Sequence, residues 1–260
     1  MRILGIESSS LVASVALVTD HVLTAEYTVN FKKTHSQTLL PMLDEIIKMT
    51  ELDLKTVDVI AVSGGPGSFT GLRIGSATAK GLGLGLKKPL AAVPTLDALA
   101  YNLYGSAFTV CPIMDARRNQ VYTGLYENEN GFSVRKEQCA MDMGDLIKEL
   151  NQAGRKVMFL GDGVPVYKEQ IAAGMTVPYE FAPAHLNRQR ASAVAALGSK
   201  YYEEGKIISP EDHAPDYLRK PQAEREREEK EREEALKAEA ASSDGMPVPA
   251  AALKKESYDS

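Results

Sequence analysis

The stretch "GGPGSFTGLRIG", Gly64–Gly75, decides how this chain folds. It follows the apolar run "VDVIAVS" and precedes the small-residue run "GSATAKGLGLGL", so it predicts a tight turn from a buried strand into a helix. Glycine-rich turns in this position often cradle phosphates. This stretch lacks the Gly-Lys-Ser/Thr that ends a Walker A motif, and it lacks the Gly-x-Gly-x-x-Gly spacing of dinucleotide-binding folds. Ser68 or Thr70 can cap the helix that follows.

The helix after this turn has an unusual composition. Phe69, Leu72 and Ile74 place apolar side chains near its start, where solvent usually prevails. Small residues then follow at Gly71, Gly75, Ala77, Ala79, Gly81, Gly83 and Gly85. A helix this rich in glycine has low intrinsic stability and needs close packing on a partner, inside the chain or outside it. Two interpretations stay open: a plain strand-to-helix turn, or a surface built for another protein.

Outward from this turn, the hydrophobic pattern predicts alternating strands and helices. Residues 2–30 read as three strands, and residues 36–49 have helical spacing. Pro41 fits that helix only if it begins near Thr38; otherwise the helix is kinked. Further strands are expected at 57–63 and 89–94, and further helices at 68–86 and 95–105. This order predicts a layered α/β architecture with a mixed sheet.

A second strand-first unit begins near residue 107. Two strands with turns at 115–119 and 127–131 lead into helix, strand and helix, and a long amphipathic helix covers 188–205. We therefore expect an N-terminal lobe, 1–106, and a C-terminal lobe, 107–220, whose last helix packs back on the first lobe. The charged remainder, 221–260, is expected to be a largely disordered tail.

Composition narrows the function. The 260 residues are 44% hydrophobic, with a formal net charge of −5, so no basic excess favours direct binding to nucleic acid. The two cysteines, Cys111 and Cys139, form neither a metal spacing nor a disulfide framework. No apolar run is long enough for a membrane helix. We expect a cytoplasmic protein.

Several turns carry residues that could meet a phosphate. Glu7, Ser8 and Ser9 lie in the first turn, where an acid and small hydroxyls suit a metal and phosphate oxygens. Other candidates are Gly64, Gly65, Asp115 beside Arg117 and Arg118, and Asp162 in an exposed "LGDGV" turn. Each of these stretches can equally be an ordinary polar turn. The four histidines are scattered, and no nucleophile–base set can be read.

The segments "ILGIESS", "HSQTLLPMLDEII", "GGPGSFTGLRIGSATAKGL" and "MDARRNQVYTGLY" together resemble the TsaB family, also called YeaZ, over Met1 to about Arg219. The resemblance implies the two-lobed actin–hexokinase–Hsp70-like fold with mixed central sheets. It also implies a non-catalytic subunit that binds its paralogue TsaD and, near that junction, TsaE. The complex makes threonylcarbamoyladenosine beside the anticodon of tRNAs reading ANN codons, and the subunit meets tRNA only through the complex.

The resemblance also assigns residues. The TsaD-binding bundle would use helices 36–49 and 68–86, which could also form a homodimer through the same face. The residues expected at this face are His35, Leu39, Leu40, Leu43, Ile46, Phe69, Thr70, Leu72, Arg73 and Ile74. On this view the helix glycines permit close packing across a subunit boundary. A charge at Leu39 or Ile74 should then break the complex and leave the fold intact.

The same resemblance argues against chemistry in this subunit. TsaD carries two metal-binding histidines one turn apart, but here the position one turn after His35 is Leu39, so the metal site is lost. The family commonly has Asp where this chain has Glu7, and the longer side chain would crowd a phosphate or its metal. No cofactor is expected, and ATP should bind weakly or not at all. The alternatives are an autonomous ATP-using phosphotransferase of the same fold, or a peptidase.

Overall fold

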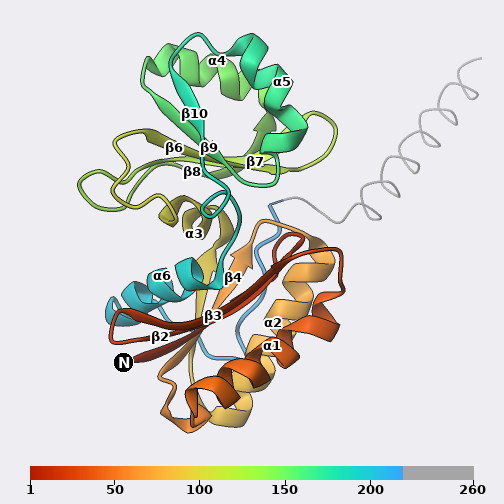
Figure 1. Ribbon diagram of the computed structural model, residues 1–260, viewed down its shortest axis with the longest axis vertical. Helices are drawn as coiled ribbons and strands as arrows, with labels where there is room; N and C mark the ends of the chain where they lie inside the picture. The colour runs from red at the N-terminus through yellow and green to blue at the C-terminus, as the bar shows by residue number, and fades with distance from the viewer. Residues whose placement is uncertain (219–260) are drawn as a thin grey trace, which may run out of the picture. The chain divides into compact units, whose positions relative to one another are not determined.

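The structure is a computed structural model that describes residues 1–218. These residues belong to one compact unit, Met1–Arg219. It contains two five-stranded mixed sheets, one in each lobe, as Figure 1 shows. The tail expected at 221–260 lies outside the described residues.

The first sheet has the strand order β3-β2-β1-β4-β5. Its strands are β1 (Arg2–Glu7), β2 (Val12–Thr19), β3 (Val22–Asn30), β4 (Val59–Gly65) and β5 (Leu90–Pro94). The first three are antiparallel neighbours, and β1, β4 and β5 run parallel. Side chains alternate between the two faces, as the pleat requires. Leu4 and Ile6 face helices α1 (His35–Thr50) and α2 (Phe69–Leu86), whereas Ile3 faces α6 (Ala191–Glu203).

The second sheet repeats this arrangement with the order β10-β9-β6-β7-β8. Its strands are β6 (Thr109–Asp115), β7 (Gln120–Glu127), β8 (Ser133–Asp142), β9 (Val157–Leu160) and β10 (Tyr179–Phe181). Helices α4 (Met143–Ala153) and α5 (Val164–Gly174) cover one face, and α3 (Thr95–Tyr101) packs on the other. Again three antiparallel strands are followed by two parallel ones. The two mixed sheets, with matching strand orders, agree with the two-lobed α/β fold with mixed central sheets expected above.

Three elements differ from the sequence prediction. Helix α1 begins at His35, not near Thr38, and continues through Pro41. The hydroxyl of Thr38 donates to the carbonyls of Thr34 and His35, so the first turn has formed before Thr38 is reached. Strand β8 was not predicted because Arg135, Lys136 and Glu137 give it a polar composition, and β10 has only three residues.

The last described segment, residues 206–217, forms a strap along α2. Ile208 exchanges two backbone hydrogen bonds of 2.9 Å with Leu90 at the edge of β5. The ammonium group of Lys80 donates to the carbonyls of Glu211 and His213, each at 3.0 Å. Farther on, the amide of Asp216 donates to the carbonyl of Gly64 at 2.6 Å. The strap therefore ends over the turn between β4 and α2, residues 64–68, which is called the glycine loop below.

Candidate functional site in the glycine loop and on helices α1 and α2

The glycine loop packs directly on the first turn of the chain. A Cβ on Gly67 would lie 2.2 Å from the carbonyl oxygen of Ser9, and one on Gly71 would lie 2.1 Å from that of Ser8. A Cβ on Gly75 would lie 2.2 Å from the Ser8 hydroxyl. These three glycines therefore serve contact within the chain. For Gly71 and Gly75, which belong to α2, this corrects the expectation that the helix glycines pack across a subunit boundary.

Of the two residues predicted to cap helix α2, Ser68 and Thr70, Ser68 does so. Its side chain accepts a hydrogen bond of 3.3 Å from the amide of Gly71, and its own amide donates to the carbonyl of Ser9 at 2.6 Å. The hydroxyl of Ser8 donates to the carbonyl of Gly71 at 2.9 Å. The Ser68 amide and the Ser8 hydroxyl, which could have met a phosphate, thus both donate to backbone carbonyls of the chain itself.

Glu7 lies at the end of β1 and is completely buried. Its Oε1 accepts hydrogen bonds from the Ser9 amide, at 2.6 Å, and from the Ser9 hydroxyl. Among the described residues its Oε2 has no hydrogen-bond partner. Burial raises the pKa of this carboxyl to about 7, against the Ser9 hydrogen bonds that lower it, and the charge of Asp162 adds to the rise. Glu7, Ser8 and Ser9 all have no exposed surface.

Two acidic residues of the second lobe, Asp162 and Asp115, lie toward Glu7. Asp162 follows β9, and burial raises its pKa to about 6 while the nearby Arg188 opposes the rise. Its Oδ1 is buried, with no partner among residues 1–218, so the expectation of an exposed Asp162 is wrong. Asp115 ends β6, accepts from the hydroxyl of Tyr167 at 3.2 Å and lies 3.4 Å from the guanidinium of Arg117.

The strap covers the glycine loop beside these acidic residues. A Cβ on Gly65 would lie 2.1 Å from the carbonyl oxygen of Asp216, and Gly64 accepts the Asp216 amide. The structure therefore gathers the predicted phosphate-site residues at the carboxyl ends of neighbouring strands, but packs protein atoms against them. Within residues 1–218, no group of three or more His, Cys, Asp or Glu side chains is placed to hold a metal ion.

The second predicted site, the face of α1 and α2, divides into buried and exposed residues. Leu39, Leu43, Ile46 and Leu72 are at most 4% exposed, within the core of the first lobe. Leu39, Leu43 and Ile46 pack in one cluster with residues of the chain's own sheet, and Leu72 is buried as well, which corrects the assignment of these residues to a partner-binding face. An inward stripe at helical spacing packs on a sheet just as well as on a second helix.

The other predicted residues remain accessible to different degrees. Leu40 is 55% exposed, Thr70 and Arg73 are exposed, and Ile74 is half-buried against the core. His35 is half-buried, with Nε2 3.0 Å from the carbonyl oxygen of Val12. The Phe69 ring packs at a tilt against Tyr217 of the strap, with ring centroids 4.9 Å apart, and the Arg73 guanidinium lies over the Phe69 ring.

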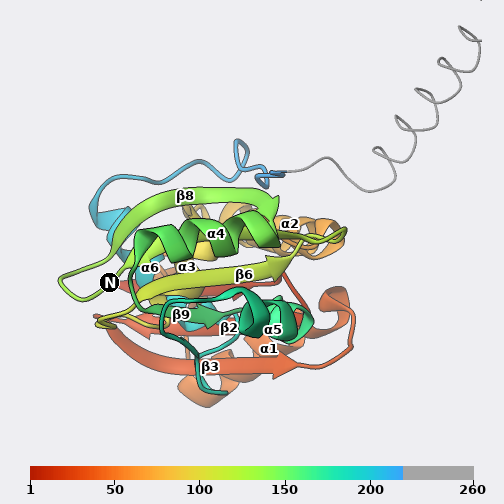
Figure 2. The ribbon, with the colours of Figure 1, turned by 90° about the horizontal axis from the view of Figure 1, so that it is seen from above.

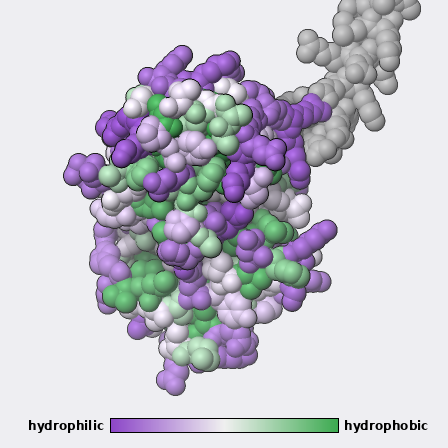
Figure 3. Space-filling view, turned by 45° about the horizontal axis from the view of Figure 1, so that its top comes forward, coloured by the Kyte–Doolittle hydropathy of each residue, from purple (hydrophilic) through white to green (hydrophobic). Residues whose placement is uncertain are grey.

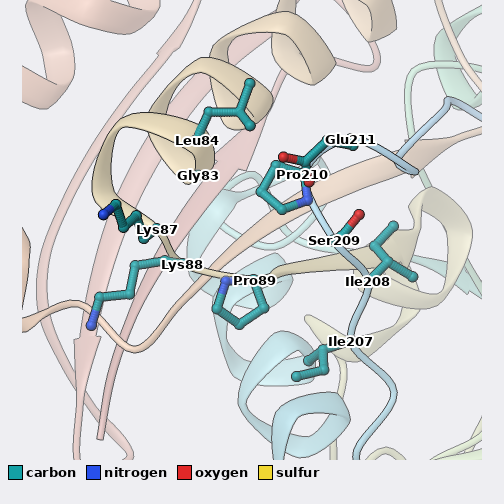
Figure 4. Close-up of a pocket in the computed structure, with 10 residues that line it drawn as sticks. All are labelled: Gly83, Leu84, Lys87, Lys88, Pro89, Ile207, Ile208, Ser209, Pro210 and Glu211. Carbon is teal, nitrogen blue, oxygen red and sulfur yellow. The ribbon is translucent and has the colours of Figure 1, made fainter.

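Sequence reasoning missed two parts of this surface, the exposed Met49 and Leu84 and the strap, and it did not separate the outward helix glycines from the inward ones. Met49 and Leu84 are 82% and 50% exposed. Gly81 and Gly85 point outward, with no atom within 4 Å of an added Cβ. The strap flanks α2 and leaves two hollows, of about 420 Å³ each, beside it. In one of them Leu84 and Pro210 lie on opposite sides, as Figure 4 shows. Helical numbering of the glycines could have separated the outward pair, but nothing in the sequence placed the strap.

On the face seen in Figure 3, hydrophobic side chains form separate patches among polar side chains. No described helix has both the length and the apolar character needed to cross a membrane. Cys111 is buried, which raises the pKa of its thiol to about 12, so it stays protonated at neutral pH.

The chain is similar to proteins of known family in both sequence and structure. The family model of TsaD, tRNA N6-adenosine threonylcarbamoyltransferase, matches residues 26–227. The tRNA threonylcarbamoyladenosine biosynthesis protein TsaB of Bacillus subtilis is 34% identical over 226 residues, which are 86% of this chain and 96% of that protein. TsaB of Escherichia coli is 30% identical over 223 residues, 84% of this chain and 95% of the relative. The solved structure of YeaZ from Pseudomonas aeruginosa has a TM-score of 0.71 at 26% identity, covering 83% of this chain and 99% of that one.

Proposed function

Because this chain belongs to the TsaB family of tRNA threonylcarbamoyladenosine biosynthesis proteins, we propose that it serves tRNA threonylcarbamoylation as the non-catalytic partner of a TsaD-type transferase. It binds TsaD through the outer face of α1 and α2, and TsaE joins near that junction. The tRNAs served are those reading ANN codons, and tRNA is contacted through the assembled complex.

The observation that carries the proposal is the pair Gly81 and Gly85. Both are exposed on α2, and no described atom lies within 4 Å of a Cβ at either position. A glycine inside a helix costs about 1 kcal/mol relative to alanine. Nothing in residues 1–218 offsets that cost, whereas a second helix that approaches closely would require the missing side chains. A helix of a partner protein supplies such an approach.

The surroundings of these glycines suit a heterodimer. Leu40 and Leu84 expose large apolar side chains on α1 and α2, and Asp44 and Lys48 form an exposed ion pair beside them. An apolar centre with a polar rim is the usual anatomy of such an interface. The hollow beside Leu84 could accept a side chain from the partner.

The test uses the full chain and TsaD from the same organism, with affinity measured by isothermal titration calorimetry and mass by light scattering. Leu40→Glu and Leu84→Glu should each weaken TsaD binding at least tenfold, because a carboxylate would be buried in an apolar contact. The thermal midpoints of both variants should stay near that of the wild type, since both positions are about half exposed.

Val166→Glu is the matched control, because Val166 is 59% exposed on α5 in the other lobe. It should bind TsaD like the wild type. Leu39→Glu no longer tests the interface: Leu39 is 2% exposed, so a carboxylate there should unfold the first lobe. Wild-type affinity in both face variants would reject the α1–α2 face, and no binding by the wild-type chain would reject the partnership itself.

A further inference from the structure

Helix α2 carries a line of positive charge on the side that faces the strap. Arg73, Lys80 and, at the end of the helix, Lys87 follow one another at intervals of seven residues. Seven residues make nearly two turns, so the three cations share one side of the helix, about 10 Å apart. Helix α2 contains no acidic residue, whereas α1 presents both signs of charge through its ion pair of Asp44 and Lys48.

No acidic side chain of residues 1–218 neutralises these three cations through an ion pair. Arg73 and Lys87 are exposed, and Lys80 is half-buried. The guanidinium of Arg73 lies over the Phe69 ring, and the ammonium group of Lys80 donates to two carbonyls of the strap. Figure 2 shows the strap, drawn in blue, passing from α6 toward α2. An ammonium group has three donors, so one N–H of Lys80 stays available.

The same cations line the two hollows beside α2. Arg73 and Lys80 line one hollow, and none of its lining residues is acidic. Lys87 lines the other hollow together with Glu211, which lies across the hollow from Lys87 in Figure 4. Both hollows therefore present positive charge along their α2 side.

The positions between the cations are small or apolar. Ala77 and Leu84 alternate with the three cations at spacings of four and three residues, and the outward Gly81 lies on the same exposed side of α2. A neighbouring helix can therefore approach α2 closely and still reach the cations at the rim of the contact. A packed helix presents the same face again after seven residues, which is the interval between the cations.

We propose that the helix of TsaD that packs on α2 carries acidic side chains one heptad apart, and that these pair with Arg73, Lys80 and Lys87. This inference rests on the proposed use of the α1–α2 face for TsaD. Nucleic acid is the other class of partner that a line of cations attracts. The formal net charge of −5 opposes that class, and a surface open to close approach fits a helix.

The ion pairs act mainly on the rate of association. Exposed pairs at the rim of an interface add little affinity. Complementary charge instead steers the two proteins together, and this steering weakens as salt is added. TsaD should therefore associate with the wild-type chain several-fold faster in dilute buffer than at about 0.5 M salt, with little change in the rate of dissociation.

Stopped-flow association of the full chain with TsaD from the same organism tests the proposal. Reversal of both exposed cations, Arg73→Glu with Lys87→Glu, should slow association roughly tenfold in dilute buffer, and the difference should vanish at about 0.5 M salt. The matched control is Lys156→Glu with Lys168→Glu, at two exposed lysines of the second lobe, which changes the net charge equally. It should associate like the wild type. Lys80 is left unchanged because it holds the strap.

Zero-length carbodiimide cross-linking of the wild-type complex identifies the acidic partners directly. Lys80 and Lys87 should each become joined to an acidic residue of TsaD, and these two residues should be seven positions apart in one segment. The proposal is overturned by linked residues at any other spacing, by wild-type association of the Arg73 and Lys87 double variant, or by equal slowing of the control. Binding of tRNA by the isolated chain that the double variant loses would overturn it too, because the cations would then serve nucleic acid.

Failure of this inference can be told from failure of the proposed function. Leu40→Glu and Leu84→Glu test the face itself. If they weaken TsaD binding while reversal of Arg73 and Lys87 has no effect on association, only the acidic heptad is rejected. If the wild-type chain does not bind TsaD, both are rejected.

Discussion

At the scale of single residues, Glu7 is the clearest case of a side chain whose role burial redefines. The sequence places an acid in the first turn, where a metal or phosphate could be met. The structure buries it completely and uses one carboxylate oxygen to hold the turn through Ser9. Its charge is therefore a cost to the fold, and that cost depends on pH.

We expect Glu7→Gln to change the pH dependence of stability. Burial raises the folded pKa to about 7, above the ordinary value of 4.5. The stability this carboxyl contributes is therefore fully present below about pH 4.5 and lost as pH rises through about 7. At roughly 1.4 kcal/mol per pKa unit, the wild type should lose about 3 kcal/mol over this range that the glutamine variant keeps. Urea unfolding of both proteins from pH 4.5 to 8 measures the difference.

Glu169→Gln is a suitable control, because Glu169 is exposed on α5. Its curve should run parallel to that of the wild type. Glutamine keeps an oxygen that can accept both Ser9 hydrogen bonds, so the turn should survive the change. Parallel curves for Glu7→Gln and the wild type would mean that the Glu7 carboxyl is not desolvated in solution.

The sequence predicted which side chains form an apolar stripe, but not what those side chains pack against. The spacing of Leu39, Leu43 and Ile46 indicated an amphipathic helix, which α1 is. The same spacing fits packing on a sheet of the same chain or on a partner's helix, so the choice needed the fold. Leu40, one residue on, faces solvent instead. Asp162 shows the same limit, since a turn residue is exposed or buried according to what packs over it.

At the scale of elements, α2 gives its glycines two different tasks. Gly71 and Gly75 face the Ser8–Ser9 turn, where a Cβ does not fit, whereas Gly81 and Gly85 face open space. The sequence predicted that this helix needs close packing, inside or outside the chain. The structure assigns the first half of the helix to the inside. It leaves the outward pair without an intramolecular reason among residues 1–218.

Alanine substitution should separate the two tasks. Gly71→Ala should destabilise the fold by roughly 1–3 kcal/mol, because its Cβ would lie 2.1 Å from the backbone oxygen of Ser8. Gly81→Ala should stabilise the fold by about 1 kcal/mol, through higher helix propensity, while it weakens TsaD binding. Urea unfolding and calorimetric titration with TsaD measure the two effects. Unchanged TsaD affinity in Gly81→Ala would show that no backbone approaches α2 there.

Element order could be read from the sequence because each buried strand and amphipathic helix carries its own period. The three-strand entry and the alternation after it are present as predicted. The elements that were not predicted, β8, β10 and the strap, depend on the segments they contact rather than on a local hydrophobic pattern. Strand β8 is polar because its edge faces solvent, and β10 is held by pairing with β9 over three residues. The strap has no period, and it is fixed by Leu90, Lys80 and Gly64.

At the scale of the whole molecule, the lobes share a buried polar junction. Asp97 of α3 accepts a hydrogen bond of 2.8 Å from the hydroxyl of Tyr126 in β7. Burial raises the pKa of Asp97 to about 6, while the hydroxyls of Tyr126 and of Tyr201 in α6 act to lower it. The strap adds a second link, since the Gln138 amide of β8 lies 3.5 Å from the Asp216 carboxylate. Both links join elements from different lobes.

This organisation bears on the alternative that the chain is an autonomous ATP-using enzyme. Ligands of open α/β sheets bind outside the carboxyl ends of parallel strands. Here that region holds Glu7 without exposed surface, the Ser8–Ser9 backbone against α2, and the backbone of Asp216 over Gly65. A nucleotide would have to displace the strap and separate the turn from the helix. Both movements would break contacts that the folded chain makes with itself.

We therefore expect the isolated chain to release no phosphate from magnesium-ATP above the rate of a buffer blank, and to bind ATP no more tightly than the millimolar range. Phosphate release and equilibrium dialysis measure the two quantities. The Lys80→Met variant is an informative companion, because Lys80 holds two carbonyls of the strap. Tighter ATP binding by this variant alone would show that the strap closes a latent site. Turnover by the wild-type chain that Ser9→Ala removes would instead favour a phosphotransferase and contradict a purely non-catalytic role.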